Sequence, residues 1–232
     1  MKGAFKSVFF GGRADGLAGK TEPRLRLVRT MALCSSCALL SSVLSAAGET
    51  HYVSPGGLHV PPFTNWVEAA TDIQSAINAC GSGDVVVVAD GTYAPGTTVR
   101  VTNGVTLVSQ NGRDSVRLDG GGLAAGQDAV FLQFGTLDGF TVSNAPRHGV
   151  KSESGAVYNC LVTHSRHNGI DSYTTPRVVA DSTLVVTNTL VRKSATNGIY
   201  TCAVDTRILG CAISESGGAG VALQQNDTTG VI

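Results

Sequence analysis

The feature that most constrains this sequence is an internal repeat in its second half. Four segments align without gaps, and each is followed at a fixed distance by a glycine and an aliphatic residue. The starts of the four segments are 20, 29 and 22 residues apart. Self-similarity at such a period is typical of a solenoid, in which each unit stacks on the next. The segments are Leu137–Asn144, Val157–His164, Val186–Lys193 and Ile208–Glu215.

Equivalent positions of the repeat form columns of one residue type. Aliphatic columns favour strands, and a column of only glycine and asparagine favours turns with left-handed backbone. Strands stacked about 4.8 Å apart would pair their backbone groups and join the aliphatic columns into apolar ladders. The repeat therefore predicts a parallel β-helix, since the Leu-x-x-Leu-x-Leu pattern of its main competitor, the leucine-rich repeat, is missing. The columns are Leu137, Val157, Val186 and Ile208; Gly139, Asn159, Asn188 and Gly210; Val142, Val162, Val191 and Ile213; Gly149, Gly169, Gly198 and Gly220; and Val150, Ile170, Ile199 and Val221.

Upstream of the repeat, short strands continue and one helix interrupts them. The helix is predicted over Thr71–Cys80, with the apolar side chains of Ile73, Ala76, Ile77 and Cys80 on one face. We expect Thr71 to cap its start and Gly81 to end it. Because a β-helix has an open apolar end, an amphipathic helix at the first coil is expected to cover that end. Strands are predicted at 84–88, 99–101, 105–108, 116–118 and 130–132.

A second pattern surrounds the helix. An Ile-Gln-x-Ala-Ile helix at Ile73–Ile77 is followed by Gly83-Asp84, by the valine strand Val86–Val88 and by Gly91-Thr92-Tyr93. Upstream lie Tyr52–Gly56, Trp66 and Ala69-Ala70. This resembles the N-terminal capping region of pectate-lyase-like right-handed β-helix proteins, and with the repeats the resemblance covers residues 51–232.

The resemblance implies an all-β fold, a right-handed parallel β-helix (solenoid) with a short N-terminal capping α-helix. It is specific for the fold and for the capping module. It says less about activity, because such proteins include polysaccharide lyases, glycoside hydrolases, phage tailspikes, adhesins and large surface proteins.

The first 47 residues differ from the rest and predict export. Seven basic residues are followed by the uncharged stretch Met31–Leu44 and by the small residues Ser45, Ala46 and Ala47, which is the layout of a signal peptide. The apolar stretch is shorter than the roughly 20 residues that a membrane-spanning helix needs, so we expect no transmembrane span and a secreted or cell-surface protein. Either Met1 or Met31 is the start of translation.

Three segments are therefore expected: a signal peptide and basic leader at 1–47, the capping helix and first coil at 48–95, and β-helix coils at 96–232. The chain stops at Ile232, directly after a repeat. An exposed final coil would leave a sheet edge of the kind that natural proteins cover. We therefore expect this chain to be the N-terminal part of a longer protein.

Net charge and cysteine spacing limit the kinds of ligand that this chain is expected to bind. The leader holds seven of the 17 basic residues and two of the 17 acidic ones, so the remainder has ten and fifteen. This acidic balance argues against nucleic acid or an anionic membrane as partner and is compatible with a polysaccharide. Cys80, Cys160, Cys202 and Cys211 lack zinc-site spacing. We expect them to be small buried hydrophobes, with no disulfide framework and no metal site.

Because inward residues of a β-helix form its core, a functional site must use outward columns and turns. The alignment gives two polar stacks, with Arg166-His167-Asn168 between them on one coil. Lys151 and Asp171 are expected to pair across one strand spacing. The polar stacks are Asn144, His164, Lys193 and Glu215, and Lys151, Asp171, Tyr200 and Ala222. The candidate substrate-binding residues are Lys151, His164, Arg166, His167, Asp171, Lys193 and Tyr200, although outward positions of a solvated sheet are usually polar in any case.

Two classes of function remain open. The favoured one is a surface or secreted glycan-binding or scaffold protein, because the motifs of known β-helix enzymes are missing. The alternative is a polysaccharide lyase, which needs a cation against the uronate carboxylate and a base for the α-proton. A protruding loop at Tyr173–Asp181 would then wall a cleft beside the coil of His164 to Asp171. Calcium is expected as a cofactor only for a lyase, yet no column stacks two acids for it, and a glycoside hydrolase would need paired carboxylates that the columns lack.

Overall fold

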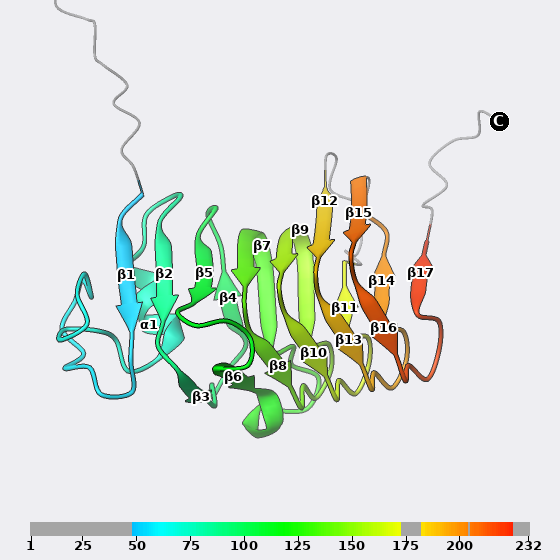
Figure 1. Cartoon of the computed structure of the whole chain (residues 1–232), viewed down its shortest axis with the longest axis horizontal. Coiled ribbons are helices and arrows are strands. Elements are labelled where there is room, and N and C mark those ends of the chain that lie inside the picture. The colour runs from blue at the N-terminus through cyan, green and yellow to red at the C-terminus, as the bar shows by residue number, and fades with distance from the viewer. Residues whose placement is uncertain (1–47, 173–181, 204, 225–232) are drawn as a thin grey trace, which may run out of the picture. The chain divides into compact units, whose positions relative to one another are not determined.

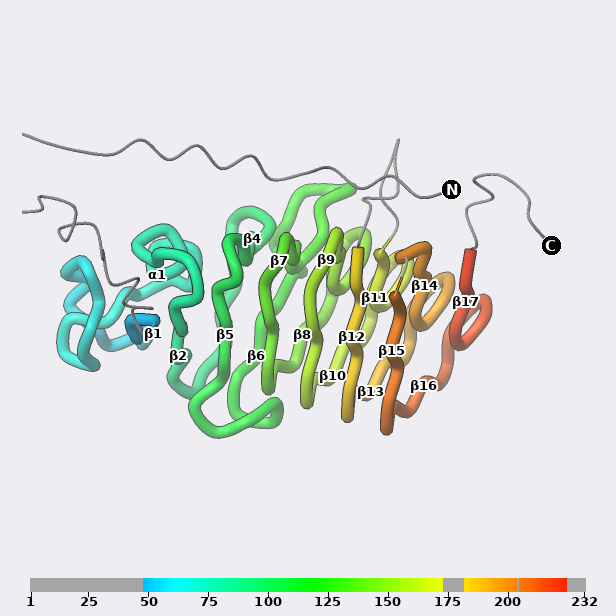
Figure 2. The backbone as a smooth tube through the Cα atoms, turned by 90° about the horizontal axis from the view of Figure 1, so that it is seen from above, coloured from blue at the N-terminus to red at the C-terminus, as the bar shows by residue number. Residues whose placement is uncertain are grey.

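The computed structural model describes residues 48–172, 182–203 and 205–224. Every strand pairing in this part of the chain is parallel, and each strand pairs with its equivalents in the neighbouring coils. Figures 1 and 2 show the chain winding through successive coils whose strands lie side by side. The predicted parallel β-helix is therefore confirmed.

The strands make three faces, which we call A, B and C in the order in which the chain passes through them. Two long strands, β7 (Val130–Asp138) and β9 (Val150–Tyr158), run from face C into face A. Face A otherwise contains β1 (Thr50–Val53), β2 (Val85–Val88), β5 (Thr106–Ser109), β12 (Thr183–Thr187) and β15 (Asp205–Leu209). Face B contains β3 (Gly91–Tyr93), β6 (Val116–Asp119), β8 (Thr141–Ser143), β10 (Leu161–Thr163), β13 (Leu190–Arg192) and β16 (Ala212–Ser214). Face C otherwise contains β4 (Val99–Val101), β11 (Ile170–Asp171), β14 (Ile199–Thr201) and β17 (Val221–Leu223).

The strand register confirms the aliphatic columns of the repeat. On face A, Leu137 lies opposite Val157, and Val186 pairs with both Val157 and Ile208. Equivalent pairings join the aliphatic columns of faces B and C. The inward side chains of these columns are fully buried in most coils and form one continuous core. Burying such ladders is the main stabilisation of the fold, because a single coil cannot cover its own apolar side chains.

Two turn columns, and not one, have left-handed backbone. The predicted column between faces A and B does so, with φ of 78° at Gly139 and 52° at Asn159. A second column follows the face B strands β8, β10, β13 and β16 and includes His164 at 56° and Lys193 at 54°. The polar stack that contains these two residues is therefore a column of turn residues beyond the sheet, and their side chains are exposed.

The predicted helix is present but shorter, as α1 (Ile73–Ala79). Its N-cap is Asp72, whose carboxylate accepts the backbone N–H of Ser75 at 2.8 Å, so the prediction of Thr71 was wrong. The Thr71 hydroxyl instead lies 2.9 Å from Nδ1 of His59. The helix ends at Ala79 with Cys80 as its C-cap, whereas Gly81 was predicted to end it.

Helix α1 covers the N-terminal end of the coils, as expected. Ile73, Ala76 and Ile77 are buried in the core, and the helix contacts β1, β2 and β4. It takes the place of a face C strand before β4. The side-chain amide of Gln74 bonds the backbone N–H of Arg100 at 2.8 Å and its carbonyl at 3.4 Å, so it satisfies part of the strand edge that no coil covers.

Of the remaining predictions, some concern residues that the structure describes and others concern residues that it does not. Cys160 and Cys202 are buried as predicted, whereas Cys80 and Cys211 are only partly buried, and all four are free thiols. Among the described residues, no helix has the length and apolarity needed to cross a membrane. The leader at 1–47, the loop at Tyr173–Asp181 and the final residue Ile232 lie outside the described residues.

Candidate functional site

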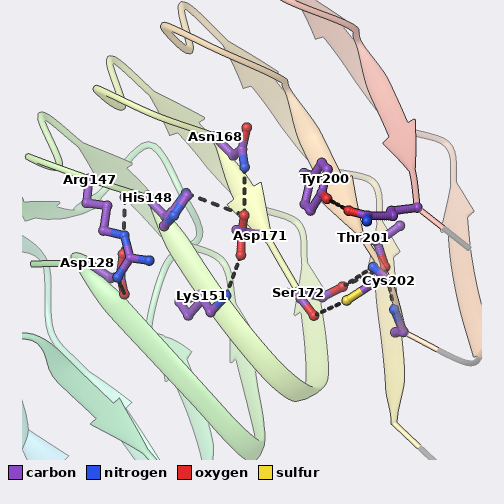
Figure 3. Close-up of polar contacts among 12 residues, drawn as sticks. Asp128, Arg147, His148, Lys151, Asn168, Asp171, Ser172, Tyr200, Thr201 and Cys202 are labelled. Carbon is purple, nitrogen blue, oxygen red and sulfur yellow. Dashed lines mark hydrogen bonds and ion pairs between the residues drawn. The ribbon is translucent and has the colours of Figure 1, made fainter. Parts of the chain in front are cut away.

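The predicted pair of Lys151 and Asp171 exists on face C. The two residues lie opposite each other in neighbouring coils, and Lys151 Nζ is 2.5 Å from Asp171 Oδ1. Tyr200 follows in the next coil. The side chains of Lys151 and Asp171 are only 12% and 4% exposed, so this ion pair is shielded from water. Figure 3 shows them in one line across the coils.

A second column of polar residues lies beside this one, directly before the glycine column. Its members are Asp128, His148, Asn168 and Asn197. The side-chain oxygens of all but His148 accept a backbone N–H of the following coil. Asp128 Oδ1 accepts the N–H of His148 at 3.2 Å, and Asn168 Oδ1 accepts the N–H of Asn197 at 3.0 Å. Asn168 Nδ2 also donates to Asp171 Oδ2 at 2.6 Å.

Together these columns form a charged cluster, which we define as Asp128, Arg147, His148, Lys151 and Asp171 (Figure 3). Nδ1 of His148 lies 3.7 Å from Asp171 Oδ2, and Arg147 lies 3.9 Å from Asp128. The sequence had indicated only Lys151 and Asp171. The position before Gly149, read as one more column of the repeat, is the signal that leads to Asp128 and His148.

Burial sets the protonation of the charged cluster. Desolvation lowers the pKa of His148 to about 4, against the opposing charge of Asp171 and with the help of Arg147 and Lys151. Burial also raises the pKa of Asp128, although the His148 N–H and Arg147 counteract it. At neutral pH His148 is therefore uncharged, and two cations face two carboxylates.

This arrangement limits the chemistry of the charged cluster. The amine of Lys151 is already engaged by the Asp171 carboxylate, with 2.5 Å between Nζ and Oδ1. The carboxylate oxygens of Asp171 face Lys151 on one side and Asn168 on the other. Asp128 and Asp171 stand on coils that are two apart, and each faces a cation, which is unlike the several oxygen ligands of a calcium site. The side chains of the charged cluster are engaged with one another across three coils, so its role is better described as structural than as catalytic.

A different feature gathers two other predicted residues. His164 and Arg166 line a surface hollow of about 300 Å³ on the turn between faces B and C. The opposite wall is formed by residues in and after the short 3₁₀ helix η1 (Gly120–Gly122). None of the lining residues is acidic. The hollow, as we name it, is lined by Gly121, Leu123, Ala125, Asn144, Pro146, His164 and Arg166.

The remaining predicted residues lie around these two features. The exposed ring of His167 meets the ring of His148 edge-on, with 5.6 Å between their centroids. Lys193 is exposed one coil beyond His164 and is not part of the hollow's lining. The hydroxyl of Tyr200 donates to the side chain of Gln224. Two of the seven candidates thus belong to the charged cluster and two line the hollow, while His167, Lys193 and Tyr200 belong to neither.

The described structure is similar to two solved β-helix enzymes. It aligns with the pectate lyase Pel9A with a TM-score of 0.52 and 16% sequence identity, over 70% of this chain and 46% of that one. It aligns with a pectin methylesterase from Aspergillus niger with a TM-score of 0.54 and 16% identity, over 78% of this chain and 62% of that one. This chain has a pectate-lyase-like right-handed parallel β-helix fold.

The predicted handedness and fold type are confirmed by these alignments. The β-helix chain spans about half of the pectate lyase and somewhat under two thirds of the pectin methylesterase. At 16% identity the likeness extends to the fold alone. No family model matches the chain, and no curated protein sequence is significantly similar to it.

Proposed function

We propose that this β-helix is an exported glycan-binding protein, and that the hollow binds an acidic sugar residue. The observation that carries the proposal is the lining of the hollow. It places Arg166, His164 and Asn144 around about 300 Å³, with no acidic residue in the lining. The Asn144 amide donates to Asp119 at 2.9 Å, so Arg166 and His164 are the groups offered to the ligand. An arginine guanidinium has the fork geometry that binds a carboxylate with two hydrogen bonds.

The surface beside the hollow supports an extended acidic ligand. Exposed basic side chains lie at the end of a face B strand or on the turn after it in three successive coils, and neighbouring coils are about 4.8 Å apart. A polymer lying across the coils would meet one or more of them at each step. We call this surface the basic ridge, and it consists of Arg147, His164, Arg166, His167, Arg192 and Lys193.

The fold and the leader agree with this function. The two similar structures are named for action on pectate and on pectin, which are polysaccharides with acidic sugars. The leader at 1–47 has the layout of a signal peptide. Secretion of the chain with removal of its leader, followed by N-terminal sequencing, tests the export part of the proposal, and recovery of an uncleaved chain inside the cell would contradict it.

A polysaccharide lyase is the second candidate, and one observation favours it. His148 is buried at 6% exposure among two cations, and its pKa of about 4 keeps it uncharged at neutral pH. Titratable groups perturbed in this way are concentrated at functional sites. Against this reading, Lys151 is already paired with Asp171. The binding function therefore has the stronger support.

The test compares binding and product formation on one panel of glycans. The full chain is incubated with immobilised acidic and neutral polysaccharides, with and without calcium, and unsaturated products are measured in parallel. We expect retention on acidic glycans that weakens with salt and falls at least roughly tenfold in Arg166→Ala, because a bidentate contact is lost. Arg207→Ala is the matched control, since Arg207 is an exposed arginine on face A that pairs with Asp205.

Each outcome separates the two candidates. Equal binding by wild type and Arg166→Ala would remove the hollow from the proposal, and no retention on any acidic glycan would reject glycan binding altogether. Unsaturated products that disappear in His148→Asn would establish the lyase in its place.

A further inference from the structure

Three metal-ligating side chains meet at the N-terminal end of the β-helix, far in sequence from the hollow. His51 lies in β1, Cys80 is the C-cap of α1, and Asp84 directly precedes β2. One ligand atom from each lies within 4.8 Å of the other two. His51 is 1% exposed, Asp84 is 8% exposed, and Cys80 is partly exposed.

The hydrogen bonds of His51 determine what its ring presents to Asp84. Nδ1 lies 2.6 Å from the carbonyl oxygen of Pro62, and because a carbonyl only accepts, Nδ1 carries a proton. Nε2 faces Asp84 Oδ2 at 3.2 Å. A contact between Nε2 and a carboxylate oxygen is favourable when one cation lies between the two atoms, and that cation is either a proton or a metal ion.

The carboxylate of Asp84 is held in place by backbone groups. It accepts the N–H of Gly81 at 2.6 Å and the N–H of Glu49 at 2.8 Å. The site thus supplies a carboxylate and an imidazole that are both fixed by hydrogen bonds to the backbone.

The geometry suits zinc. Tetrahedral zinc with bonds of about 2.0–2.1 Å to nitrogen and oxygen places those two atoms about 3.3 Å apart, close to the 3.2 Å between His51 Nε2 and Asp84 Oδ2. Bringing the sulfur to bonding distance needs a movement of up to about 1 Å. The Cys80 thiol, which donates to the Ala76 carbonyl oxygen at 3.2 Å, would give up that contact on binding. The bond from His51 to the Pro62 carbonyl is the type of outer contact that orients metal-binding histidines.

We propose that His51, Cys80 and Asp84 bind a zinc ion, with water at the fourth position. The ion would join β1, the end of α1 and the start of β2, and so clamp the capping module to the first coils. On binding, the Cys80 thiol loses its proton to solvent and becomes the thiolate ligand. The sequence does not reveal this site, since its ligands are 29 and 4 residues apart and match no zinc motif.

The test uses the reduced full chain in a Cys34→Ser, Cys37→Ser background, because these two leader thiols would also bind metal. Zinc binding is measured by calorimetry, and cobalt binding by absorption. We expect about one zinc ion per chain, a sulfur-to-cobalt charge-transfer band in the near ultraviolet, and a melting temperature that rises with zinc. Cys80→Ser should bind at least roughly 100-fold more weakly, because even outer contacts of a metal site are worth 10–100-fold.

Cys211→Ser is the matched control, since Cys211 is the other partly buried thiol and lies at the opposite end of the coils. It should bind zinc like the background chain. The proposal is overturned if cobalt gives no sulfur band with the background chain, a measurement that does not depend on any variant at the site. It is also overturned if Cys80→Ser binds zinc as tightly as Cys211→Ser does, in which case His51 and Asp84 form an ion pair only.

Discussion

At the scale of single residues, the glycine column shows how little room the coils leave. A Cβ atom at Gly169 would lie 2.3 Å from Cγ1 of Val191 and 2.7 Å from the carbonyl oxygen of Gly198. The backbone of Gly169 is not left-handed, so the requirement is for space and not for conformation. Gly149 and Gly198 face the same two obstacles in their own coils.

Gly169→Ala is therefore expected to destabilise the β-helix by roughly 2 kcal/mol, because overpacking a core typically costs 1–3 kcal/mol. Chemical denaturation followed by circular dichroism measures the change. Gly96→Ala is the control, since nothing lies within 4 Å of its Cβ position, and it should stay within about 0.5 kcal/mol of wild type. Equal stability of the two variants would contradict the packing argument.

The aliphatic and glycine columns could be predicted because each coil places the same demand on the same position. The polar column before the glycines could not, because its members are of three types: Asp128, His148, and the asparagines Asn168 and Asn197. What unites most of them is a side-chain oxygen that bonds the backbone of the next coil. These contacts form only when the coils are stacked. The sequence therefore indicated Lys151 and Asp171 but not the other members of the charged cluster.

At the scale of elements, the start of α1 depends on one side chain. Asp72 accepts both the N–H and the hydroxyl of Ser75, at 2.8 and 2.7 Å. Asp72→Ala should lower the free energy of unfolding by about 1 kcal/mol, the usual effect of losing an N-cap. Asp72→Asn should retain nearly all of it, because asparagine caps about as well. Urea denaturation of the three proteins distinguishes them, and a loss as large in Asp72→Asn would show that the charge matters and not the cap.

The sequence located this helix but misplaced its first residue, since Thr71 and Asp72 are both good caps. Asp72 is the N-cap because the Thr71 hydroxyl contacts His59, which lies in a loop that no local sequence pattern predicts. The strand lengths were likewise set by contacts between coils and not by local sequence. β7 and β9 each continue through a corner where short separate strands were expected. They pair with each other on both sides of that corner, with a register shift between Leu132 and Gly135.

At the scale of the whole β-helix, stability depends on the contacts between neighbouring coils. A charge placed between two coils therefore changes the free energy of their stacking. The charged cluster extends over three coils, with His148 in the middle one and Asp128 and Asp171 on either side. At neutral pH the uncharged His148 separates two balanced ion pairs. Protonation would add a third cation beside Arg147 and Lys151, in a position where Asp171 is already occupied.

This arrangement predicts a specific loss of stability in acid. The pKa of His148 is about 4 in the folded chain, below its ordinary value of 6.5, so between these values the unfolded chain binds the proton and the folded chain does not. Stability must then rise with pH across this interval and be lost as pH falls from 6.5 towards 4. Melting temperatures of wild type and His148→Asn, measured across the interval, check the prediction. Asparagine already occupies the same column at Asn168 and Asn197, so the variant fits the stack and should have a shallower profile. Parallel profiles would mean that the carboxylates alone set the acid stability, and that His148 is not held neutral by the coils around it.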